Sequence, residues 1–213
     1  MSNTFAANAG VAVNPPALQS FGPGGQIYNA DLFGGFPIKT NKRENALFQF
    51  RKGDGAVEFS DLITNLEEAG KIGSTMAFMV THVGFRIIPT SADSLLEPAD
   101  IAALKFLMDA AQVEIFYGSN GTKVGEFSGM HMMAPVDFVA GDATNTCAVA
   151  NAGNTGSNFI KLSEPIQIEP NLQIKGVVRF GADIPVGLLP ASPDDPAKFA
   201  FVVHLYGIKQ VAA

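Results

Sequence analysis

Strict alternation of apolar and polar residues in the last third of the chain is the feature that most constrains the fold. Residues 166–180 alternate on both sides of a Pro170-Asn171 turn, and residues 199–206 place four large apolar side chains on one face, namely Phe199, Phe201, Val203 and Leu205. A period of two puts successive side chains on opposite faces of a β-strand. This part of the chain therefore predicts antiparallel strands that pack at least one face into a core.

Shorter patterns extend the same reading toward the N-terminus. Further strands are predicted at 46–51, 57–59, 76–88, 113–117 and 123–127, with Asn120-Gly121 as a tight hairpin turn in which both residues need a positive φ. Helices are predicted at 98–110 and, more briefly, at 61–69. A chain of 213 residues with seven or eight strands fits one all-β antiparallel sandwich, with one or two short helices in its loops.

The first 43 residues differ from the rest, because they are rich in Ala, Asn, Gly and Pro and have no sustained period. A solvated tail is one reading, but the segment carries too many large apolar residues for a linker. We therefore predict two parts, an extended N-terminal arm at 1–43 and a sandwich domain at 44–213. The arm would lie on another surface, its own or a neighbour's, through inter-subunit anchors at Phe21, Ile27, Tyr28, Leu32, Phe33 and Phe36. Deleting 1–36 should then leave a folded domain that does not assemble.

Charge argues against a conventional nucleic-acid-binding domain. The chain has 14 Lys and Arg residues, which are scattered, and a net charge of −6, whereas phosphate binding needs clustered positive charge. The only basic cluster comprises Lys39, Lys42 and Arg43. A solvated loop explains it, and a weak, non-specific genome contact is the alternative.

No catalytic or metal-binding constellation emerges from the motifs. The three histidines, His82, His131 and His204, are far apart and lack the His-x-His pair of cupin-type metalloenzymes. Cys147 has no basic neighbour to lower its pKa, and the acid pair Asp194-Asp195 fits an exposed turn between two prolines. We predict no enzymatic activity, no metal and no cofactor.

Membrane and export signals are also missing from the sequence pattern. The most apolar long stretch, 76–88, is interrupted by His82 and Arg86 and is too short to cross a bilayer as a helix. The first residues have neither a basic nor an apolar signal region. We therefore expect no transmembrane segment and synthesis in the host cytoplasm.

The C-terminal third resembles the jelly-roll major capsid proteins of small tailless icosahedral bacteriophages. The resemblance is carried by Phe159-Ile160-Lys161-Leu162, by Glu164-Pro165-Ile166-Gln167-Ile168-Glu169-Pro170, by the strand from Ile174 to Phe180 and by the ending from Phe201 to Ile208. It covers about the last two-thirds of the chain, and the chain departs from many virus coats in lacking a strongly basic arm. It implies a single jelly roll of about eight strands.

The same resemblance implies a structural virion protein that self-assembles into an icosahedral capsid around the viral genome. Its partners would be copies of itself and other minor virion proteins, with loops 139–158 and 185–196 as surface or symmetry-axis contacts. Two other classes stay open: a phage receptor- or carbohydrate-binding β-sandwich module, and a cupin-like metal-dependent enzyme. The absence of Trp counts against the first and the missing His-x-His against the second.

Overall fold

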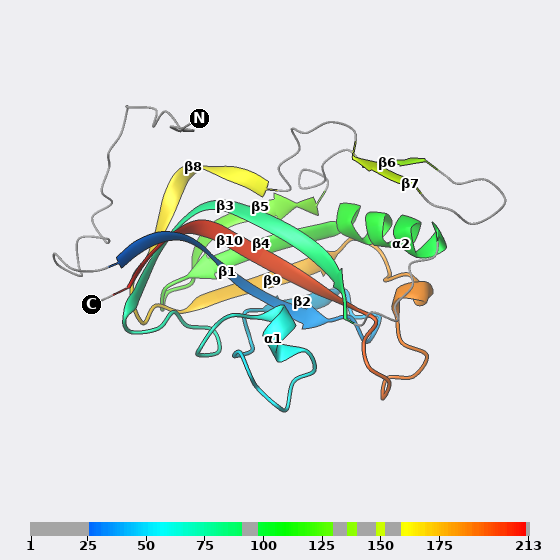
Figure 1. Cartoon of the computed structure of the whole chain (residues 1–213), viewed down its shortest axis with the longest axis horizontal. Helices are drawn as coiled ribbons and strands as arrows, with labels where there is room; N and C mark the ends of the chain where they lie inside the picture. Colours follow the sequence, from blue (N-terminus) through cyan, green and yellow to red (C-terminus); the bar gives the residue numbers. More distant parts are fainter. Residues whose placement is uncertain (1–25, 91–97, 130–135, 140–147, 152–158, 212–213) are drawn as a thin grey trace, which may run out of the picture.

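Two four-stranded antiparallel sheets pack face to face in the computed structural model, which describes residues 26–90, 98–129, 136–139, 148–151 and 159–211 (Figure 1). The first sheet has the order β1 (Gln26–Pro37), β10 (Phe199–Val211), β3 (Met76–Pro89) and β8 (Phe159–Ile168). The second has the order β2 (Glu44–Leu47), β9 (Ile174–Phe180), β4 (Ala111–Tyr117) and β5 (Thr122–Ser128). The remaining elements are the hairpin of β6 (Val136–Val139) and β7 (Ala148–Asn151), and the helices α1 (Ser60–Ile63), α2 (Pro98–Asp109) and η3 (Val186–Leu188).

The pairing of these strands defines a jelly roll. Strand β1 pairs with β10, β2 with β9, β3 with β8 and β4 with β5, all antiparallel. The first half of the chain thus runs as a ribbon against the second half, and this ribbon wraps into two sheets. The predicted fold class, an all-β sandwich of single jelly-roll type with about eight strands and short helices in loops, is confirmed.

Strand β10 lies at the centre of the molecule and is buried on both faces. Its inward residues Phe199, Phe201, Val203 and Leu205 join the main core between the sheets, as the alternation predicts. The Phe201 ring contacts rings from both sheets, with centroid distances of 5.8 Å to Phe36, 5.9 Å to Phe85 and 5.6 Å to Phe180. On the opposite face, Ala200 and Val202 pack with Ile63 of α1. This second burial explains why the strand is apolar on both sides at its start.

Local backbone geometry corrects four of the predicted elements. The strand expected at 46–51 ends at Leu47 because Phe48 has a left-handed φ of 60°, and residues 57–59 form no strand. The helix expected at 61–69 is one turn, α1. The hairpin exists, but its positive φ angles belong to Gly118 and Gly121 rather than to Asn120 and Gly121. Residues 118–121 therefore form a four-residue connection instead of a two-residue turn.

The predicted boundary between arm and sandwich at residue 43 is wrong, because residues from Gln26 onward already belong to the sandwich. All twelve residues of β1 pair with β10, from Gln26 opposite Val211 to Pro37 opposite Ala200. The part of the predicted arm at 1–25, which includes Phe21, lies outside the described residues. Deleting 1–36 would remove almost all of β1, so the structure argues against the expectation that this truncation folds.

Several connections meet at one end of the sandwich. Pro37 and Pro89 pair with the first residues of β10, and the Phe180 N–H donates to the Arg43 carbonyl. The segments 38–43, 90–110 and 181–198 therefore begin or end close together. The predicted loop 139–158 is partly outside the described residues and contains β7, while loop 185–196 contains η3. None of the described helices is long and apolar enough to cross a membrane.

Candidate functional site

The predicted arm anchors divide into core residues and exposed residues. Leu32 and Phe36 are only 3% and 7% exposed and belong to the main core of their own chain. Phe33 is half-buried against the Ala200 and Val202 cluster. Leu32 and Phe36 therefore anchor β1 within the sandwich, which contradicts their assignment as inter-subunit anchors. Phe33 keeps part of its side chain exposed, and its assignment stays a prediction. Ile27 and Tyr28, at 56% and 43% exposed, remain available for contacts with another molecule.

The predicted basic cluster is largely occupied by carboxylates of the same chain. The Lys39 ammonium lies 2.6 Å from the Glu58 carboxylate, and hydrogen bonding from Lys39 holds the pKa of Glu58 below its ordinary value. Arg43 binds Asp183 at 2.8 Å, while Lys42 is exposed. Two of the three basic residues are thus engaged, which reduces the positive charge that they offer to a phosphate.

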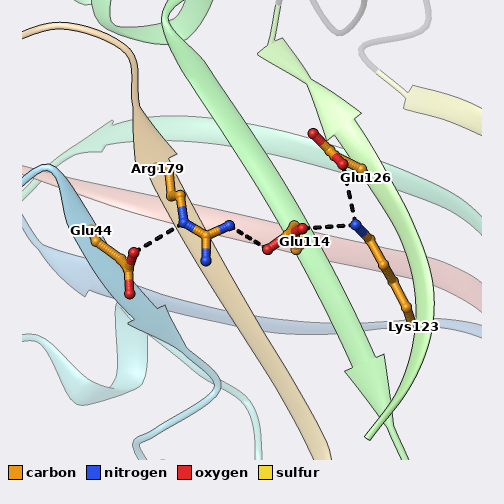
Figure 2. Close-up of polar contacts among 5 residues, drawn as sticks. All are labelled: Glu44, Glu114, Lys123, Glu126 and Arg179. Carbon is orange, nitrogen blue, oxygen red and sulfur yellow. Dashed lines mark hydrogen bonds and ion pairs between the residues drawn. The ribbon is translucent and has the colours of Figure 1, made fainter.

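A row of alternating charges, here called the charge ladder, crosses the outer face of the second sheet (Figure 2). Arg179 of β9 donates to Glu44 of β2 at 3.0 Å and also to Glu114 of β4. Lys123 of β5 then donates to Glu114 at 2.7 Å and to Glu126 at 3.1 Å. The ladder joins all four strands of this sheet through neighbouring acids and bases.

The ladder shifts the titration of three of its members. Hydrogen bonds from Lys123 and Arg179 lower the pKa of Glu114, and the same contacts raise the pKa of both Lys123 and Arg179. Each of these three shifts favours the ionised form, which suits a structural role better than proton transfer. The sequence shows these charges on alternating strand positions, but only the register of the sheet places them side by side.

The outer face of the first sheet carries a shallow, open depression of about 680 Å³, here called the hollow. It is lined from three strands, by Asn29, Ala30, Asp31, Thr81, His82, Tyr206, Gly207 and Ile208. A β-bulge makes part of this wall, because β10 steps from Tyr206 to Gly207 while β3 steps from His82 to Val80. The extra residue is Thr81. The bulge lets two consecutive side chains, Thr81 and His82, line the same hollow.

A half-buried carboxylate–imidazole pair adjoins the hollow. The His204 Nδ1 atom lies 3.1 Å from the Asp31 carboxylate, so Nδ1 carries the proton and donates it. Burial lowers the pKa of His204 despite the opposing effect of Asp31. The His204 ring stacks on Tyr206 at 5.5 Å, and Tyr206 in turn contacts Phe159 at 4.2 Å. Burial raises the pKa of Tyr206, so its phenol stays neutral.

Sequence reasoning missed this cluster. It treated His82 and His204 as isolated strand residues and placed Asp31 in an arm outside the domain. The three residues meet because β10 lies between β1 and β3, with Asp31 opposite Tyr206 and Tyr206 opposite His82. The available signal was polar residues, His82 and His204, on otherwise apolar strands. Within the described residues, no group of three His, Cys, Asp or Glu side chains could hold a metal ion.

The class that this architecture defines is the single jelly-roll β-sandwich. Comparisons with known protein families and with curated proteins find no match for the chain.

Proposed function

We propose that this protein is a coat subunit, a structural virion protein that self-assembles into a closed icosahedral capsid around a viral genome. The observation that carries the proposal is the jelly-roll pairing of β1, β2, β3 and β4 with β10, β9, β8 and β5. Capsid subunits are one of the classes that use this architecture. The resemblance of the C-terminal third to bacteriophage coat proteins favours that class over lectins and cupins.

Long connections at both ends of the sandwich support a wall unit. One end carries the segments 90–110, 129–158 and 181–198, and the opposite end carries the segment 48–75 beside the short connections 118–121 and 169–173. Loops vary without disturbing the sheets that carry them. Loops at either end can therefore form contacts around a symmetry axis while the sandwich keeps its shape.

The first half of β1 supports contact with a neighbouring subunit. The middle of its outer edge is covered, because the Asn65 side chain donates to the Asp31 carbonyl at 2.9 Å and accepts from the Phe33 N–H at 2.8 Å. Over Gln26–Ala30, β1 pairs with β10 alone, and no described strand lies on its other side. An open edge beside the exposed Ile27 and Tyr28 invites pairing. In a shell, such an edge is buried between subunits.

The test is light scattering after size-exclusion chromatography, with negative-stain images of the same peak. We expect particles of megadalton mass and uniform diameter. Deleting 1–25, which leaves β1 intact, should give a folded subunit with an unchanged β-sheet circular dichroism spectrum that no longer forms particles. The exchange Glu126→Gln, on the opposite sheet, is the matched control and should still assemble.

Two results would count against the proposal. A full-length chain that stays monomeric or trimeric across a range of salt and pH would contradict the coat function. Particles formed equally well without residues 1–25 would leave the coat function in place and refute the arm.

A further inference from the structure

We propose that the hollow between β1, β10 and β3 is a binding site for a neutral, hydroxyl-rich ligand of the size of one or two pyranose sugar rings. The proposal does not depend on the coat function, because it rests on the groups that line this one sheet face. The hollow is open to solvent, and its volume of about 680 Å³ gives room for a ligand of this size. The ligand class follows from the hydrogen-bonding groups and the local charge.

The hydrogen bonds already made in the hollow leave acceptors free. The Thr81 hydroxyl donates its single proton to the Tyr206 carbonyl at 3.2 Å. In the 2.9 Å contact with His82 it therefore accepts, and His82 Nδ1–H is the donor. In the tautomer with its proton on Nδ1, His82 has an unprotonated Nε2. Asp31 uses Oδ2 to accept from His204, which leaves Oδ1, and its side chain is 39% exposed. The exposed Asn29 amide adds an acceptor and two donors.

Local charge favours a neutral ligand over a cation. Asp31 is the one carboxylate among the residues that line the hollow. Two cations lie on the strands beside it, since Arg86 of β3 acts electrostatically on both His204 and Tyr206, and Lys161 pairs with His82 in the β3–β8 register. An ammonium or guanidinium group would therefore meet repulsion as well as attraction. Sugar hydroxyls donate to the same acceptors without adding charge.

The aromatic part of the hollow is held in place by neighbouring rings. Tyr206 lies between His204 and Phe159, with centroid distances of 5.5 Å and 4.2 Å. A side chain fixed in this way loses little entropy when a ligand contacts it. Ile208 adds an apolar neighbour, and Gly207 places no side chain there. The hollow thus combines a fixed Tyr206 side chain with several polar groups.

Saturation-transfer difference NMR tests the proposal, because it observes the ligand and works on a free subunit or on a large particle. The probes are methyl glucoside, methyl galactoside and N-acetylglucosamine, each up to tens of millimolar, with Nα-acetyl-arginine amide as the cationic probe. We expect saturable transfer to at least one sugar and none to the arginine probe. Asn29→Ala and His82→Ala should each weaken sugar binding by about five- to tenfold, the loss of one hydrogen bond.

Two further variants separate a role in the hollow from a general effect. His82→Gln keeps a polar group near the position of Nε2 and should recover part of the affinity. Glu126→Gln changes the opposite sheet and should bind like the wild type. Binding of the arginine probe alone, sugar binding unchanged in both alanine variants, or no transfer to any sugar would each overturn the proposal. None of these outcomes affects the scattering test of the coat function.

Discussion

Replacing Gly207 by alanine should be among the most damaging small changes in this protein. Gly207 lies in β10 immediately after the bulge, opposite Val80. A Cβ atom added there would lie 1.7 Å from the Met79 carbonyl oxygen, whereas real Cβ contacts are essentially never shorter than 3.0 Å. The φ angle of Gly207 is not in the left-handed region. The penalty is therefore steric, and β10 and β3 would have to separate by about 1.3 Å to relieve it.

That separation falls on the pairing beyond the bulge. From Gly207 to Val211, β10 pairs with Val80 to Met76 of β3. Overpacking a tight site costs about 1–3 kcal/mol, and each ladder hydrogen bond that is lost costs about 1 kcal/mol more. We expect the free energy of unfolding to fall by about 3–5 kcal/mol. This is a large part of the roughly 5–15 kcal/mol that holds a domain folded.

The assay is urea unfolding followed by circular dichroism, at two protein concentrations so that any stabilisation by assembly is detected. The control is Gly55→Ala, since a Cβ there meets nothing within 4 Å and the φ angle is not left-handed. It should change the free energy of unfolding by no more than about 1 kcal/mol. If Gly207→Ala lost less than about 1 kcal/mol, the close approach of β10 to β3 would be refuted.

Two predictions concern titration. Burial holds the pKa of His204 below its ordinary 6.5, so the unfolded chain binds more protons at this site than the folded chain does. The stability present above the unfolded pKa is therefore lost as the pH falls from about 6.5 through the lower folded pKa. In urea unfolding between about pH 7 and pH 5, His204→Phe should lose less stability than the wild type, and an equal loss would contradict this. In the variant Arg179→Met, the pKa of Glu114 should rise part of the way toward its ordinary value, because the hydrogen bond from Lys123 still lowers this pKa. The measurement is the titration of the Glu114 carboxyl by NMR, and an unchanged titration would show that Arg179 does not act on Glu114.

The sequence pattern predicts strands with large apolar residues at every second position, and it fails where glycine conceals close packing. β10 is identified in this way, because Phe199, Phe201, Val203 and Leu205 recur with a period of two and all face the main core. Strand β1 was assigned to an arm because residues 1–43 are rich in Ala, Asn, Gly and Pro, Gly34 and Gly35 among them, and show no sustained period. A Cβ at Gly34 would lie 2.3 Å from the Phe48 ring, and one at Gly35 would lie 2.1 Å from the Phe201 carbonyl oxygen. These glycines mark a close approach of backbone and side chains inside the sandwich.

The candidate sites depend on register, which a single sequence does not reveal. The charge ladder needs Arg179 beside both Glu44 and Glu114, and the hollow needs Asp31 beside His204. These partners are separated along the chain by long connections whose lengths do not fix the strand order. The bulge at Thr81 adds one residue to β3 and so reverses the faces of the residues that follow it. Polar residues on strands were visible in the sequence, but the neighbours that give them a role were not.

The central position of β10 has a consequence for the order of events during synthesis. Residues 199–211 form the strand between β1 and β3, and β1 is paired along its whole length with β10. On its other edge, β1 has an isolated bridge between Gly34 and Thr64. Until residues 199–211 have been translated, the first sheet lacks a central strand and β1 lacks its main partner. Contacts between such distant segments also form slowly. A growing chain therefore exposes unpaired, apolar strands until β10 has been translated, and this is the interval in which chaperones would act.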